Sequence, residues 1–138
     1  MAFEDGSDRI IGAAIEVHRC LGPGFLKSVY ENALRVELAR RGIAFVNQAA
    51  VPIRYRDVDV GTHILDLLVE DRFVVELKAV RRLEDIHFVI VRSYLKAVGR
   101  EHALLLKLRR LQARGQARLL ARLPGRLPPF WVCGFPRS

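Results

Sequence analysis

Two short apolar runs that each hold a carboxylate constrain this chain more than any other feature of its sequence. Residues 64–69 read Ile-Leu-Asp-Leu-Leu-Val, and residues 73–80 read Phe-Val-Val-Glu-Leu-Lys-Ala-Val. Such apolar, β-branched runs are typical of buried strands, and a buried strand rarely holds a charge that is neither paired nor bound to a metal ion. Asp66, Glu76 and Lys78 therefore need a chemical explanation.

The geometry of that explanation depends on the turn between the two runs. Glu76 and Lys78 are two residues apart, so their side chains leave the same face of a strand. If residues 70–72 form a three-residue loop, Asp66 lies opposite Glu76, with the two Cβ atoms about 5 Å apart. A two-residue loop would instead place Asp66 opposite Leu77, on the wrong face.

Two carboxylates this close repel each other, so the pair should share a proton or hold a cation. Mg²⁺ prefers oxygen ligands, keeps several waters, and is usually held by one or two carboxylates plus a substrate phosphate. A metal ion held there by Asp66 and Glu76 could activate a water and stabilise charge on a phosphoryl group. Lys78 could orient or deprotonate that water or stabilise the transition state.

A fourth candidate, Glu31, lies in a helix that the apolar periodicity predicts over about residues 25–41. It precedes Leu34 by three residues and Leu38 by seven, so it shares their inward-facing side. Taken alone, an acid on a helix is usually solvated, and a Glu-x-Lys on a strand is often a surface ion pair. The combination favours a site.

The order of elements predicts the fold class. Helical patterns cover about residues 8–20, capped by Ser7 or Asp8, then 25–41 and 83–98, and strand patterns cover 51–56, 64–69, 73–80 and 103–106, with a turn at 57–61. A three-strand meander followed by a crossover helix and one more strand gives an α/β, α+β-like domain. Its core is a mixed sheet of about four strands flanked by helices.

The net charge of +8 is concentrated in the last quarter of the chain. Residues 1–101 hold all fifteen acidic residues together with fifteen Lys and Arg, so their charges balance. Residues 102–138 hold eight basic residues and no acid. We therefore divide the chain into a domain over residues 1–108 and an arginine-rich extension over 109–138. Such a tail favours a polyanionic partner, nucleic acid before membrane, although a solvated tail is an equal alternative.

Other features indicate a cytoplasmic protein. The acidic N-terminus lacks the basic region of a signal peptide, and no apolar run approaches the roughly 20 residues of a membrane span. Two cysteines, far apart in the sequence, read as free thiols.

With these residues in this order, the chain resembles the PD-(D/E)XK nuclease superfamily and, more closely, its small bacterial family of GxxExxxR proteins. The matching segments lie within residues 8–107 and include 11–18, 21–25, 29–31, 66–69, 75–80 and 93–96. The resemblance implies a restriction-endonuclease-like core with Glu31, Asp66, Glu76 and Lys78 as catalytic residues. It also implies that the three acids bind Mg²⁺ or Mn²⁺. Where the family usually has Gln on the third helix, this chain has Ile90.

We expect a metal-dependent hydrolase that cleaves phosphodiester bonds in DNA, or less favourably RNA. The main alternative is a catalytically inactive nucleic-acid-binding or regulatory domain with the same fold, and a third is a protein-interaction module with a basic tail. A chain this small has few elements to spare for wrapping a duplex, so a homodimer is a reasonable expectation.

Overall fold

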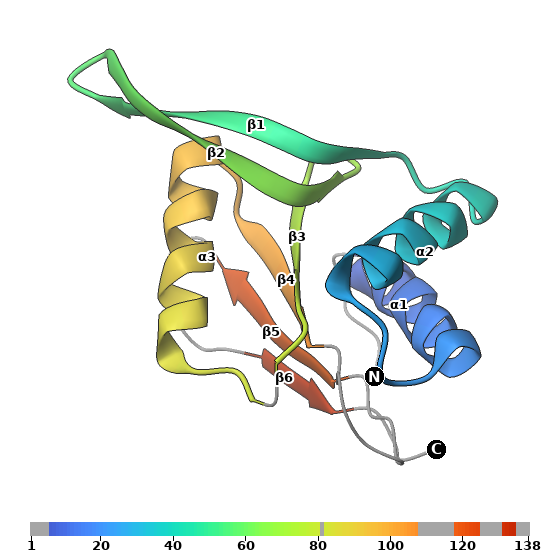
Figure 1. Cartoon of the computed structure of the whole chain (residues 1–138). Coiled ribbons are helices and arrows are strands. Elements are labelled where there is room, and N and C mark those ends of the chain that lie inside the picture. Colours follow the sequence, from blue (N-terminus) through green and yellow to red (C-terminus); the bar gives the residue numbers. More distant parts are fainter. Residues whose placement is uncertain (1–5, 81, 108–117, 125–130, 135–138) are drawn as a thin grey trace.

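The computed structural model describes residues 6–80, 82–107, 118–124 and 131–134 (Figure 1). The helices are α1 (Ser7–Leu21), α2 (Lys27–Arg40) and α3 (Asp85–Val98). The strands are β1 (Phe45–Tyr55), β2 (Val58–Val69), β3 (Phe73–Lys78), β4 (His102–Lys107), β5 (Arg118–Pro124) and β6 (Trp131–Gly134). No helix within these ranges has the length and apolar character needed to cross a bilayer.

The strands form one mixed sheet in the order β1-β2-β3-β4-β5-β6. Neighbours are antiparallel except β3 and β4, which are parallel and joined by α3. The first four strands with their flanking helices are the predicted mixed-sheet core. The last two come from the segment assigned to the extension, and β5 pairs with β4 over residues 118–124.

Helices cover both faces of this sheet (Figure 1). On one face α1 and α2 bury a core that includes Ile10, Leu34 and Leu38 together with Leu67 and Val75 of the sheet. A second core lies beneath α3 on the other face, around Val91, Leu95, Val74 and Leu105. Strands β2 to β4 are therefore buried on both sides, which explains their nearly continuous apolar sequences.

The helix ends follow local chemistry, with one correction. Gly6 in the left-handed region precedes α1, and no side chain caps that helix, so the prediction of a Ser7 or Asp8 cap is wrong. Gly42 follows α2 with φ +69°, in the left-handed region. The Gly42 N–H donates to the Ala39 carbonyl and the Ile43 N–H to the Leu38 carbonyl, the two bonds of a Schellman motif.

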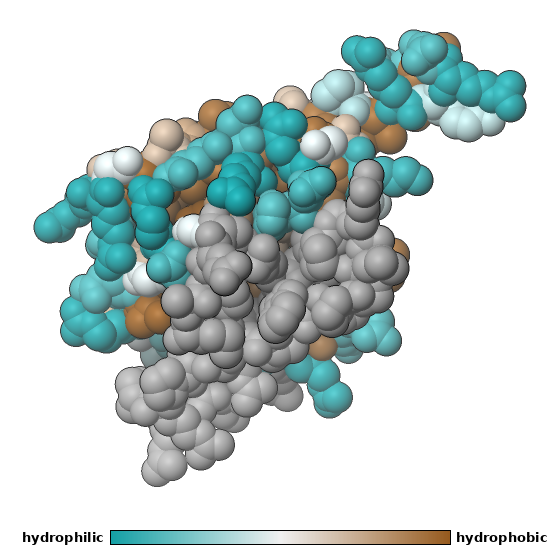
Figure 2. Space-filling view, turned by 180° about the vertical axis from the view of Figure 1, so that it is seen from behind, coloured by the Kyte–Doolittle hydropathy of each residue, from teal (hydrophilic) through white to brown (hydrophobic). Residues whose placement is uncertain are grey.

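Strands β1 and β2 form a long hairpin that projects beyond the helices (Figure 1). Its turn is limited to Arg56 and Asp57, both left-handed, so the predicted turn over residues 57–61 was too long. We call its outer part, residues 49–65, the hairpin arm. Hydrophobic and hydrophilic residues are mixed at its tip (Figure 2), where Tyr55 and Val58 are exposed.

At the base of the arm, both hairpin strands break the regular alternation of side chains between the two faces of the sheet. We call this break the reset. In β2, Leu67 packs beneath α1 and α2, whereas Leu65, two residues away, packs beneath α3. In β1, Phe45 lies against the first core and Ala49 against the second, with left-handed Gln48 (φ +50°) between them. Strict alternation would keep each pair on one face. The reset therefore marks Asp66, and Gln48 across from it, as irregular positions.

Candidate active site

The predicted register brings Asp66 and Glu76 together. Val69 pairs with Phe73 and Leu67 with Val75, as a three-residue turn requires, so the register that places Asp66 opposite Glu76 is confirmed. Beyond the Leu67–Val75 pair, the backbone N–H groups of the two strands donate to carboxylate oxygens instead of to carbonyl groups of the opposite strand. The Asp66 N–H donates to Glu76 Oε1 (3.0 Å), and the Leu77 N–H donates to Asp66 Oδ2 (2.9 Å). Each acid thus holds the backbone of the opposite strand.

Burial sets the electrostatics of this pair. Asp66 is 8% exposed and Glu76 only 4%. Burial raises the pKa of Glu76 to about 7 and the neighbouring Asp66 charge adds to the rise, while the Asp66 N–H and the Lys27 charge oppose it. Glu76 therefore changes protonation near neutral pH, as expected for two carboxylates that cannot both be charged without a cation.

Lys27, which the sequence analysis did not identify, supplies part of that positive charge. Its Nζ lies 2.8 Å from Asp66 Oδ2 and 3.0 Å from Oδ1. Lys27 is the first residue of α2, and the preceding turn is fixed by Tyr30, whose hydroxyl donates to the Gly22 carbonyl. Its position four residues before Glu31, hence on the same helix face, was the available signal.

Glu31 reaches the site from α2 but is held by a different partner. Gln48 Nε2 donates to Glu31 Oε1 at 3.0 Å. Burial raises the pKa of Glu31 and the Asp66 charge raises it further, whereas Lys27 and the Gln48 hydrogen bond lower it. Glu31 is therefore half-buried within electrostatic range of Asp66, as its helix face predicted. Gln48 was also missed, because a left-handed residue inside a strand has no sequence signature.

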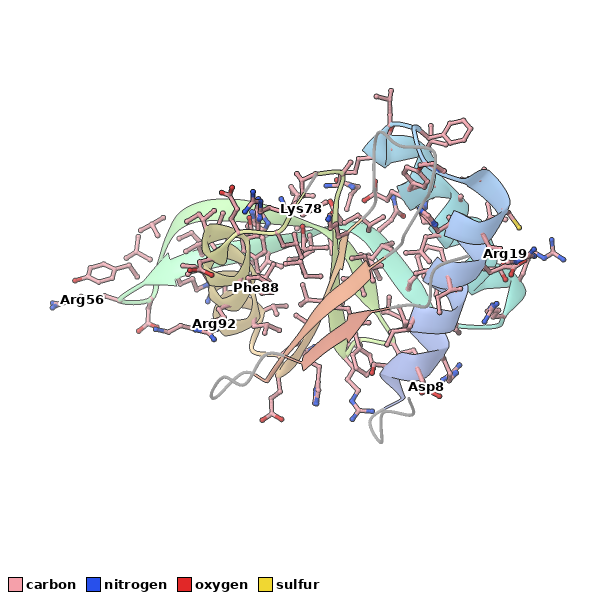
Figure 3. The ribbon with its side chains drawn as sticks, turned by 90° about the horizontal axis from the view of Figure 1, so that it is seen from below. Asp8, Arg19, Arg56, Lys78, Phe88 and Arg92 are labelled. Carbon is pink, nitrogen blue, oxygen red and sulfur yellow. The ribbon has the colours of Figure 1, made fainter. Side chains whose placement is uncertain are left out.

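Lys78 lies at the end of β3, two residues after Glu76 and half-buried (Figure 3). It lines a hollow of about 520 Å³ together with Leu26, Lys27, Ser28 and Ala79. Among the described residues, no hydrogen bond or ion pair is recorded for its ammonium group. The hollow thus has a lysine from α2 and a lysine from β3 beside the carboxylate pair, a setting that suits a phosphate group.

Within the described ranges, no three His, Cys, Asp or Glu side chains gather closely enough to form a complete metal site. The oxygen atoms of Asp66 nevertheless already accommodate one cation, the Lys27 ammonium. Mg²⁺ needs only one or two carboxylates, with water and substrate oxygens completing its shell. Asp66 and Glu76 therefore fit such an ion, and the Asp66 charge also acts on Glu31.

Two histidines make contacts that involve α3. His87 caps α3, since its Nδ1 accepts a hydrogen bond from the Glu84 N–H at 2.9 Å. His63 stacks on Tyr94 of α3, with ring centroids 3.4 Å apart. Three residues before Asp66, it would lie on the far face under strict alternation. The reset of the strand instead leaves it within range of the Asp66 and Lys78 charges.

The fold is that of a nuclease-like domain, and comparison with known families agrees. The family model that describes the PD-(D/E)XK nuclease superfamily matches residues 4–119 of this chain. The chain therefore belongs to that superfamily. Neither a curated protein nor a solved structure gave a significant match. The superfamily implies a nucleic acid substrate and a divalent metal, without identifying which metal.

Proposed function

We propose that this chain is a Mg²⁺- or Mn²⁺-dependent nuclease that hydrolyses phosphodiester bonds in DNA. The observation that carries the proposal is the buried Asp66–Glu76 pair, held face to face by each other's backbone and with the Glu76 pKa raised to about 7. The Lys27 ammonium group contacts Asp66, and its charge also acts on Glu76. A second cation, brought with a substrate phosphate, would balance the remaining negative charge.

The proposed roles follow from the positions of the side chains. Asp66 and Glu76 would hold the metal, with Glu31 of α2 as the third acid of the site. When bound, the metal supplies an activated water and stabilises charge on the phosphoryl oxygens. Lys78 lines the adjoining hollow, where its ammonium group orients the attacking water or neutralises the transition state. Lys27 lines the same hollow, so its ammonium group would also face a phosphate bound there.

A cleavage assay tests this proposal. Supercoiled and linear DNA are incubated with the protein and Mg²⁺ or Mn²⁺, beside Asp66→Asn and the matched control Asp71→Asn in the exposed turn. We expect wild type and the control to cleave and Asp66→Asn to lose activity. Absence of cleavage by wild type with either metal, or equal cleavage by all three, would sink the proposal.

The second candidate function is binding or regulation without catalysis. The Lys27–Asp66 ion pair favours it, because an ammonium group already satisfies both Asp66 oxygens without a metal. Ile90 in place of the amide usual in GxxExxxR proteins supports it as well. Binding of DNA without cleavage in the same assay would establish this alternative.

We further propose membership of the GxxExxxR family, on the motifs given above, and a cytoplasmic location, which the free, exposed Cys20 suits. A homodimer stays an expectation from chain size. Size-exclusion chromatography with light scattering would test it.

A further inference from the structure

A second cavity, of about 790 Å³, opens between the hairpin arm and α3. One wall comes from the hairpin arm and the other from α3. Its polar lining consists of Arg54, Thr62, His63, Ser93, Tyr94 and Lys96. We call this cavity the arm cleft.

The charge of the arm cleft suits an anion. Arg54 and Lys96 line it, and no acidic side chain of the described residues does. Lys96 is exposed, and no hydrogen bond or ion pair is recorded for it within those residues. Arg54 pairs with Asp59 at 2.9 Å, but both side chains are about two-thirds exposed, at 64% and 66%. Such an exposed pair is weak and leaves Arg54 able to contact another anion.

Aromatic rings form another part of the lining. His63 and Tyr94 stack with their planes 19° apart, one ring from each wall of the cleft. His63 Nε2 is buried, and none of the described residues offers it a hydrogen-bond partner. A ligand with both a flat ring and polar edges would match these two features.

The charges of the carboxylate pair act on two residues that line the arm cleft. After burial, the charges of Glu76 and Asp66 raise the pKa of Tyr94. Burial lowers the pKa of His63, and Asp66 and Lys78 act on it with opposite signs. A chain of phosphates lying in the cleft would therefore run close to the proposed cleavage site.

We propose that the arm cleft binds a single-stranded segment of nucleic acid adjoining the phosphate to be cleaved. Arg54 and Lys96 contact its phosphates, and a base stacks at the His63–Tyr94 pair. A single strand is favoured over a duplex because bases in a duplex stack on one another and would have to be flipped out to meet these rings. Only the link to cleavage rests on the proposed nuclease activity.

Binding to the full-length protein without metal tests the cleft separately from catalysis. Fluorescence anisotropy would compare a labelled oligothymidine with a duplex of equal length, in EDTA and over a range of salt. We expect tighter binding of the single strand. The plot of log K against log salt has a negative slope, to which each single-strand phosphate contact contributes about 0.7. The double variant Arg54→Gln/Lys96→Gln should therefore make this slope shallower by about 1.4.

Matched variants separate the cleft from general charge and from folding. Arg19→Gln/Arg40→Gln removes two exposed arginines of α1 and α2 and should leave the slope unchanged. Tyr94→Leu should weaken oligothymidine binding by at least about fivefold through lost stacking. Tyr94→Phe, which keeps the ring, should bind like wild type and shows that the site tolerates substitution.

Several results would overturn the proposal: no oligothymidine binding by wild type, tighter binding of the duplex, or equal losses in the arm-cleft and control double variants. Failure of the nuclease proposal looks different. If wild type never cleaves DNA yet the cleft variants lose single-strand binding, the cleft stands and catalysis fails. If wild type cleaves and the cleft variants bind like wild type, catalysis stands and the cleft fails.

Discussion

The β2–β3 hairpin carries two pairs of acidic residues in opposite environments. Glu70 and Asp71 occupy its turn, with side chains 37% and 79% exposed, and each pairs with an arginine, at 2.9 and 2.8 Å. Asp66 and Glu76, a few residues along the same strands, are buried, and Lys27 forms an ion pair with Asp66. Exposed ion pairs contribute little and remain solvated. The comparison shows that position in the hairpin, rather than residue type, creates a pair with charge left to attract a metal ion.

The two acid pairs should differ most in how the cleavage rate responds when a basic side chain next to each pair is replaced. Lys78→Met should lower the cleavage rate by about 10²- to 10⁴-fold, the usual contribution of a positioned acid or base. Arg100→Gln, which removes the partner of Asp71, should leave the rate unchanged. Single-turnover kinetics on plasmid DNA would measure both. Equal effects would mean that the two acid pairs do not differ in function.

A second contrast concerns the dependence of stability on pH. The pKa of Glu76 is raised from 4.5 to about 7 on folding, so the folded state binds this proton more tightly than the unfolded state. The resulting stabilisation, roughly 3 kcal/mol, is fully present below about pH 4.5 and is lost as pH rises through 7. Urea unfolding at pH 5, 7 and 8 without metal should show this loss.

The control for this prediction is a pair of matched amides. Glu76→Gln should remove the component of the pH dependence that lies between pH 5 and 8, whereas Glu70→Gln in the turn should keep it. A wild-type profile that Glu76→Gln leaves unaltered would contradict the raised pKa.

The smallest contrast is in the stability of the two ion pairs. Lys27→Met leaves the buried Asp66 carboxylate without its ammonium partner and should cost about 1–3 kcal/mol at neutral pH. Arg100→Gln acts on an exposed pair and should cost at most about 1 kcal/mol. Urea unfolding of both variants measures the difference, and added Mg²⁺ should restore Lys27→Met more than Arg100→Gln. The reverse order of stabilities would argue against a buried, cation-dependent Asp66.

Much of the arrangement of these acidic residues could be predicted from the sequence, because it depends on patterns within short segments. Two apolar runs separated by three polar residues left two registers open, and the structure has the one with Val69 opposite Phe73, in which the carboxylates face each other. The helix face of Glu31 followed in the same way from the apolar periodicity of residues 25–41.

The parts that could not be predicted depend on how distant segments meet. Lys27 contacts Asp66 only because the turn before α2 folds against the sheet, thirty-nine residues away in sequence. Gln48 and Asp66 reset the strand alternation through backbone geometry that residue types do not reveal. Strict alternation from Asp66 would place His63 on the far face, whereas it stacks on Tyr94 of α3. The roles of Glu31, Asp66, Glu76 and Lys78 in catalysis stay predictions.

Binding of Mn²⁺ tests the central claim, that Asp66 and Glu76 form the metal site, most directly. Isothermal titration calorimetry would compare wild type with Asp66→Asn and with Asp71→Asn, the same change made in the exposed pair. We predict that wild type and Asp71→Asn bind Mn²⁺ with equal affinity and that Asp66→Asn does not bind it. Equal binding by all three proteins, or no binding by wild type, would contradict the account.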